Sequence, residues 1–172
     1  ITAWARSTAY SVGQVRQNGS NAYRVITAGT SASSGGPSGT GSNITDGTVH
    51  WKYLSAVNYT SISAWGAAVV AASPLSQDYV GQVWNVGVIT PAVGTPILSL
   101  SGVTTNGHTI TLTAASGESF RDTLRANSAL PLSYNAANGV AFQLPATGEG
   151  FINYINVDVD GFILDGIQYK DP

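Results

Sequence analysis

The sequence predicts an all-β protein: a small β-hairpin module (residues 1–57), a connector (58–75) and a second β domain (76–172). Short runs of β-branched and aromatic residues recur along the chain, separated by turns rich in glycine, proline and asparagine. Only 9% of the 172 residues are charged and 20 are glycine. Ordinary domains contain about 25% charged residues, so this composition suits a β-rich protein whose turns consume glycine.

Two hairpins are predicted in the first module. Val12–Val15 and Ala22–Ile26 are β-prone runs, and Asn18-Gly19 between them predicts a tight turn because both residues tolerate positive φ. A second turn is predicted at Asp46-Gly47. One face of the strand that follows carries Val49, Trp51 and Tyr53. Residues 29–41 contain no apolar side chain larger than alanine or proline, which predicts a surface loop.

The connector contains a run of alanine and valine from Ala64 to Ala72. A helix is one interpretation of this run. However, the run has no amphipathic pattern, and its central glycine costs a helix about 1 kcal/mol. We therefore expect residues 62–70 to form a strand or an irregular segment that leads into the second domain, and Pro74 to end it.

The second domain is predicted to consist of short strands. In His108–Thr113, Ile110 and Leu112 are expected to face inward and the threonines outward. A similar alternation occupies residues 155–160, where apolar residues lie between asparagine and aspartate. Phe120–Pro131 is less regular and fits either one helical turn or a loop packed on the core.

The first third of the chain resembles the small N-terminal modules of bacteriophage fibre and spike proteins and, more distantly, chitin-binding modules of chitinases and cellulases. The residues that carry this resemblance are Trp4, Tyr10, Gly13, Asn18-Gly19, Tyr23-Arg24-Val25, Asp46-Gly47-Thr48, Trp51 and Tyr53. In those carbohydrate modules, exposed rings stack on sugars. The resemblance therefore implies a glycan site at Trp4, Tyr23, Trp51 and Tyr53. The alternative is that these rings form the core, because a module this small has few other apolar groups to bury.

The second half is similar to the opening coils of right-handed parallel β-helix proteins, which occur in phage spikes and secreted polysaccharide-degrading enzymes. The residues that carry this similarity are Ile97–Gly102, Ile110–Leu112 and Val157–Ile167. An antiparallel jelly roll or sandwich is the alternative, since it also uses short alternating strands. Because a stable β-helix needs several stacked coils, we expect a truncated β-helix and a processed chain or fragment.

The charged residues define no catalytic or metal site. Asp158 and Asp160 point the same way from one strand, as a carboxylate pair for glycoside hydrolysis would, but solvated positions explain them better. They also lack the other ligands of a calcium loop. His50 and His108 belong to different domains. We therefore expect no catalytic residues, no metal and no cofactor.

Net charge and hydropathy exclude two classes of partner. The formal charge is −2, and the seven lysines and arginines are scattered singly, so the chain has no basic patch for nucleic acid. The longest apolar stretch is too short to span a bilayer, so we expect no membrane insertion. Cysteine is absent, which excludes disulfide bonds.

Together, these observations and resemblances predict an extracellular, virion-surface protein, part of a head or tail fibre or spike. It is expected to recognise host cell-surface polysaccharide without catalysis or to attach the spike to the particle. Its expected partners are that polysaccharide, other virion proteins and two further copies of itself in a homotrimer. One alternative is the N-terminal part of a polysaccharide lyase or hydrolase with catalytic coils downstream. The other is a purely structural virion protein.

Overall fold

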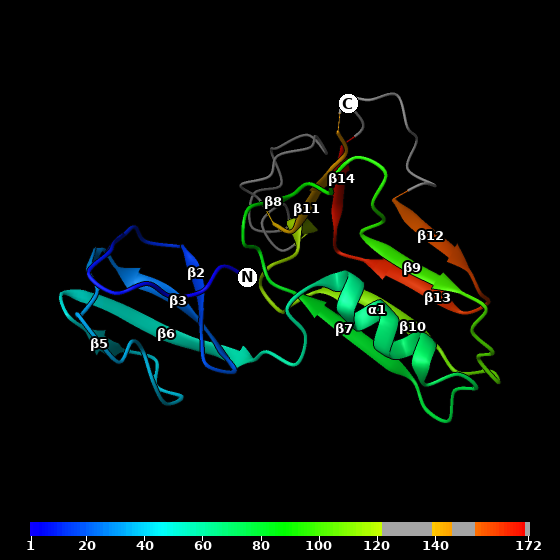
Figure 1. Ribbon diagram of the computed structural model, residues 1–172, viewed down its shortest axis with the longest axis horizontal. Coiled ribbons are helices and arrows are strands. Elements are labelled where there is room, and N and C mark those ends of the chain that lie inside the picture. Colours follow the sequence, from blue (N-terminus) through cyan, green and yellow to red (C-terminus); the bar gives the residue numbers. More distant parts are fainter. Residues whose placement is uncertain (122–138, 146–153, 171–172) are drawn as a thin grey trace. The chain divides into compact units, whose positions relative to one another are not determined.

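The protein is mostly β and divides into two compact units, Ile1–Thr60 and Ser61–Pro172. The computed structural model describes residues 1–121, 139–145 and 154–170. Over these residues α1 is the one complete helix, Phe120 and Arg121 are also helical, and no helix is long and apolar enough to cross a membrane (Figure 1). The predicted all-β class is confirmed. Most of Phe120–Pro131 lies outside the described residues.

The first unit is built on a four-stranded antiparallel sheet in the order β2-β3-β6-β5, beside a pair formed by β1 and β4. The strands are β1 (Ala9–Tyr10), β2 (Val15–Asn18), β3 (Asn21–Thr27), β4 (Gly29–Thr30), β5 (Ile44–Asp46) and β6 (Val49–Ala56). The two predicted hairpins are therefore confirmed as β2-β3 and β5-β6, but the predicted strand Val12–Val15 is wrong except for its last residue, because β2 begins at Val15.

A glycine sets the turn of each hairpin. Asn18 pairs with Asn21 and Asp46 with Val49, which leaves the two-residue loops Gly19-Ser20 and Gly47-Thr48. The glycine comes first in both loops, with φ of +59° and +67°, as type II′ turns require. In the first hairpin the two loop residues are thus Gly19 and Ser20, one residue later than the predicted turn pair Asn18-Gly19.

The second unit contains three separate sheets, each with parallel strands only. Its strands are β7 (Tyr79–Val83), β8 (Val88–Ile89), β9 (Leu98–Ser101), β10 (Ile110–Ala114), β11 (Ala141–Gln143), β12 (Ile155–Asp158), β13 (Phe162–Asp165) and β14 (Gln168–Lys170). The sheets are β7-β10-β13, β8-β11-β14 and β9-β12, so each takes every third strand. Parallel pairing contradicts the jelly roll and the antiparallel sandwich, the predicted alternatives.

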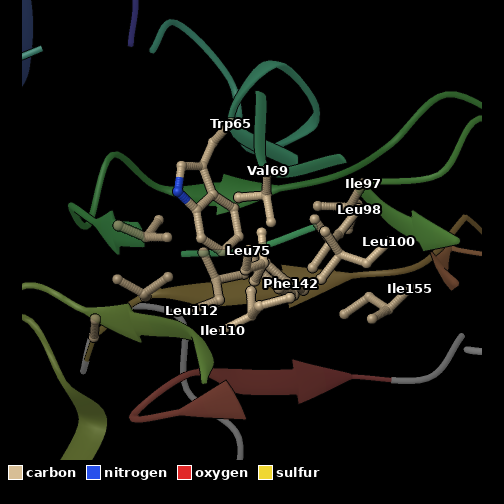
Figure 2. Packing of buried hydrophobic residues seen from close by; sticks show 13 residues of the cluster. Trp65, Val69, Leu75, Ile97, Leu98, Leu100, Ile110, Leu112, Phe142 and Ile155 are labelled. Atoms are coloured by element: carbon tan, nitrogen blue, oxygen red, sulfur yellow. The ribbon is translucent and has the colours of Figure 1, made fainter. Parts of the chain in front are cut away.

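Inward-facing side chains from all three sheets meet in one hydrophobic cluster. On β10, Ile110 and Leu112 are buried while the threonines between them are partly exposed, which confirms the predicted alternation. Leu98 and Leu100 come from a second sheet and Phe142 from the third. Figure 2 shows these side chains converging below Trp65 and Val69 of the helix. The three sheets therefore share a core that none of them could bury alone.

The helix α1 (Ile62–Ala71) corrects the prediction of a strand or irregular segment over residues 62–70. Its N-cap is Ser61, whose hydroxyl accepts a hydrogen bond from the Ala64 amide at 3.0 Å. Trp65, Gly66 and Val69 form its buried face, which packs on β9 and β7 (Figure 1). The exposed face carries Ser63 and the alanines Ala64, Ala67 and Ala71 rather than charged residues, so the sequence shows no polar face opposite the buried one.

Gly66 also has a packing role that outweighs its poor helix propensity. A Cβ atom there would lie 2.6 Å from Leu98 Cδ1, so the glycine lets the helix approach β9 closely. Because α1 packs within the second unit, most of the predicted connector 58–75 belongs to that unit. The division after Thr60 lies close to the predicted end of the first module at residue 57.

Replacing Trp65 tests the contribution of the helix to the core. The ring is 6% exposed, and Trp65→Ala should lower the free energy of unfolding by about 3–5 kcal/mol. Chemical denaturation followed by far-UV circular dichroism measures this change. Ser63→Ala, on the exposed side of α1, is the control and should change stability by less than about 0.5 kcal/mol. Equal effects of the two substitutions would contradict the packing of α1 on the sheets.

Candidate functional site

The aromatic cluster of the first unit contains the four residues predicted to bind glycan. Its buried members are Tyr10, Tyr23, Val25, Val49 and Trp51, and its partly buried members are Trp4, Ile44 and Tyr53. Alternation along β6 places Val49 and Trp51 on the inner face, as the sequence predicted. The four predicted site residues thus belong to one cluster, but they differ in their access to a ligand.

Tyr23 and Trp51 offer no face to a sugar, which corrects the prediction for these two residues. Their exposed fractions are 1% and 0%. The Trp51 ring makes an edge contact with Tyr10 at a centroid distance of 4.9 Å, and the Tyr23 ring makes one with Tyr53 at 5.9 Å. A small module with no disulfide uses its largest rings to build its core.

Trp4 and Tyr53 are half-buried and remain the accessible members of the predicted set. Trp4 is held in one orientation because its indole Nε1 donates to Asp46 Oδ2 at 2.8 Å and its backbone amide donates to Gln17 O at 2.8 Å. Its ring lies so close to Gly36 that a Cβ there would be 3.0 Å from Trp4 Cδ2. Trp4 is therefore a fixed, partly exposed ring.

Asp46 is the residue that the sequence analysis missed. Its buried carboxylate, 4% exposed, accepts hydrogen bonds from Trp4 Nε1 at 2.8 Å, Trp51 Nε1 at 3.2 Å and the Ala32 amide at 3.0 Å. It thereby joins the N-terminal segment, β6 and the long loop. Its sequence position offered one clue, since Asp46 is the sole acidic residue among the first sixty. The sequence pattern Asp46-Gly47 predicts a turn but no role in the core.

The predicted surface loop, residues 29–41, is anchored to the sheet rather than loosely attached. Asn18 Nδ2 donates to Gly35 O and to Pro37 O, each at 3.0 Å. The Tyr53 amide donates to Gly41 O and the Tyr23 hydroxyl to Gly39 O. Glycine and small polar residues let the loop follow the sheet closely, so it holds a defined shape beside Trp4.

The described acidic residues Asp78, Glu118, Asp158 and Asp160 of the second unit have different surroundings. Asp158 and Asp160 are both exposed, as predicted, but they do not share a strand, because β12 ends at Asp158 and Asp160 lies in the following turn. Glu118 is 6% exposed and accepts a hydrogen bond from the Asn85 amide. The Thr109 amide, donating to Asp78 Oδ1 at 2.8 Å, holds the pKa of that carboxyl below its usual value. Within the described ranges no three His, Cys, Asp or Glu side chains gather as metal ligands.

The two histidines occupy different units. His50 Nδ1 lies 2.8 Å from Asn43 Oδ1 in the first unit, and His108 Nδ1 lies 3.5 Å from Asp78 Oδ1 in the second. The prediction that they belong to different domains is therefore confirmed. Each has a nearby polar partner in its own unit.

Comparisons of the chain with protein families, with curated proteins and with solved structures found no match. The virion-fibre resemblance therefore rests on the residues that carry it, and the function is argued from the chain's own structure.

Asp46→Ala tests whether one carboxylate organises the first unit. The substitution leaves two indole N–H groups and one amide without their acceptor, and we expect a loss of about 2–4 kcal/mol in the free energy of unfolding. Denaturation followed by NMR of the amide resonances of residues 1–60 reports on this unit alone, because tryptophan fluorescence would also report on Trp65 and Trp84 of the second unit. Thr45→Ala, exposed on the same strand, is the control and should be nearly neutral. A neutral Asp46→Ala would contradict the assignment.

Proposed function

We propose that the chain is a non-catalytic component of a virion fibre or spike. It recognises host cell-surface polysaccharide through the first unit, and the second unit is the beginning of a right-handed parallel β-helix that supports it. The observation that carries this proposal is the succession of strands in the second unit, in which each sheet takes every third strand in parallel. Parallel strands stacked in this order are what coils of a solenoid produce.

The register of the sheets supports the β-helix. Gly81, Leu112 and Leu164 lie in one row across β7, β10 and β13, and Leu112 is 2% exposed. Leu164, in the last strand of that row, is 37% exposed. The helix α1 covers the opposite end of the row, where a Cβ on Gly81 would meet the Trp65 ring at 2.7 Å. One end is thus capped, and the core of the other end is partly open.

The glycan site of this proposal is reduced to Trp4 and Tyr53. Tyr23 and Trp51 hold these two rings in place. The Tyr23 ring contacts the Tyr53 ring, and the indole N–H groups of Trp4 and Trp51 both donate to Asp46 Oδ2. A rigid ring loses little entropy when a sugar stacks on it, which favours recognition. The burial of two of the four rings favours a second function, attachment of the spike to another virion protein, because the remaining aromatic surface is smaller.

Glycan titration of the full chain tests recognition by the first unit. Capsular and lipopolysaccharide oligosaccharides should quench tryptophan fluorescence, and Trp4→Leu or Tyr53→Leu should weaken binding about tenfold through loss of a stacked ring. The unfolding transition of each variant verifies its fold. Tyr59→Leu, a ring that is 45% exposed outside the cluster, is the matched control. If no glycan binds and the chain co-purifies with a particle protein, attachment replaces recognition.

The homotrimer is a further part of the proposal. On the outer side of β7-β10-β13, Val80 and Ile163 lie in register on either side of Thr111 and are 59% and 46% exposed. Two exposed apolar side chains in one row of a regular sheet, separated only by a threonine, favour contact with a partner. This row is therefore the surface on which we expect copies of the chain to meet.

Mass measurement by light scattering should give three times the mass of one chain at micromolar concentration. Ile163→Ser should weaken association about tenfold, because a buried isoleucine contributes about 1.5–3 kcal/mol. Val93→Ser replaces a side chain that is 59% exposed outside the strands and should leave the mass unchanged. A well-folded monomer at this concentration would rule out the trimer.

A further inference from the structure

A second site lies in the second unit, where β10 ends. There the chain forms a half-open depression of about 270 Å³. Its polar lining consists of Thr113, Ser116, Gly117, Ser119, Arg121 and Asp165. Asp165 comes from the end of β13, beside β10 in the same sheet, so two strands and the turn after β10 build the depression together.

The turn at the rim of the depression, residues 115–118, is held by a hydrogen bond within the turn and by another to the segment that follows β7. The Glu118 amide donates to Ala115 O at 2.9 Å, and Gly117 has φ of +78°, which glycine adopts without strain. The Glu118 carboxylate is 6% exposed and accepts from the Asn85 amide at 3.2 Å. A buried side chain from the turn thus ties it to the segment that follows β7.

Arg121 and Asp165 form an ion pair within the depression. The guanidinium also lies 5.9 Å from the centroid of the Phe120 ring, and the Arg121 amide donates to Ser119 Oγ at 3.2 Å. Ser119 also packs closely against Gly166, the residue that follows Asp165. A Cβ atom on Gly166 would lie 2.8 Å from the Ser119 hydroxyl oxygen. Both charged groups are therefore positioned before any ligand arrives.

We propose that this depression binds one uncharged sugar residue of a glycan. The proposal rests on glycan recognition as the proposed function and adds a second binding position to it. The ion pair has no net charge, so it gives no electrostatic preference for an acid or a base. It still presents guanidinium donors and carboxylate acceptors side by side, with serine and threonine hydroxyls around them. Sugar hydroxyls, which donate and accept at once, match this arrangement.

The size and lining of the depression narrow the ligand further. A volume of about 270 Å³ is below the range of about 300–1,000 Å³ typical of sites for drug-sized ligands, so it accommodates a sugar unit rather than a long chain. Among the residues that the structure describes, no aromatic side chain lines it. Recognition here therefore depends on hydrogen bonds, in contrast to the ring stacking proposed at Trp4.

The test uses the isotopically labelled full chain, titrated with methyl glucoside, methyl galactoside, N-acetylglucosamine and glucuronic acid while amide resonances are followed by NMR. We expect at least one neutral sugar to shift resonances of residues 113–121 and 165. Arg121→Met should weaken that binding about tenfold, because it removes the charged donor. Asp165→Asn should do the same by removing the charged acceptor. Asp160→Asn, an exposed acid outside the depression, is the control.

The possible outcomes separate the two proposals. Shifts confined to residues around Trp4 and Tyr53 would overturn the second site and leave recognition by the first unit standing. Shifts near Arg121 that survive both substitutions would also overturn it. Preference for glucuronic acid would overturn the assignment to an uncharged sugar. If no sugar produces shifts in either unit and no oligosaccharide quenches fluorescence, both proposals fail.

Discussion

Burial of inward-facing rows is the constraint on which the second unit depends. No single sheet has strands long enough to form a core, and β8 has only two residues. Stability comes instead from bringing Leu98, Leu112 and Phe142 of three different sheets into one cluster. The cap formed by α1 is part of the same solution, because Trp65 fills the space that Gly81 leaves above the first strand. The stability of the three sheets and of α1 therefore depends on one shared core.

The first unit solves its own stability problem by a different route. With neither a disulfide nor a large core, it uses a buried carboxylate as a shared acceptor for two tryptophans and a loop amide. A charged acceptor makes stronger hydrogen bonds than a neutral one, and three donors compensate for the loss of its hydration. The rings that a binding surface would need most are thereby drawn into the core. Recognition and stability compete for the same aromatic residues.

The hairpins and strand alternations were predictable because they depend on local chemistry. Gly19 and Gly47 mark their turns in the sequence, and alternation predicted the inward positions of Ile110 and Leu112. The helix was not predicted because its exposed face carries alanines rather than charged residues, and because Gly66, a poor helix former, is there for close packing on β9. The sequence left Trp51 open between a glycan site and the core, and it did not predict the role of Asp46, since both depend on contacts between segments far apart in the chain. The same is true of the pair Arg121 and Asp165, which only the register of β10 and β13 brings together.

The capping of one end by α1 gives the stack of strands a direction. At the end that α1 covers, the helix meets β7 and β9, and a further strand would have to displace it. At the other end, β13 and β14 have no strand beyond them among the described residues, and Leu164 and Tyr169 are each 37% exposed. A strand added beyond β13 or β14 would pack on these two side chains, whereas a strand added beside β7 would meet α1. The two edges of the β7-β10-β13 sheet therefore differ among the described residues, since α1 packs against β7 at one edge and β13 is left unpaired on its outer side at the other.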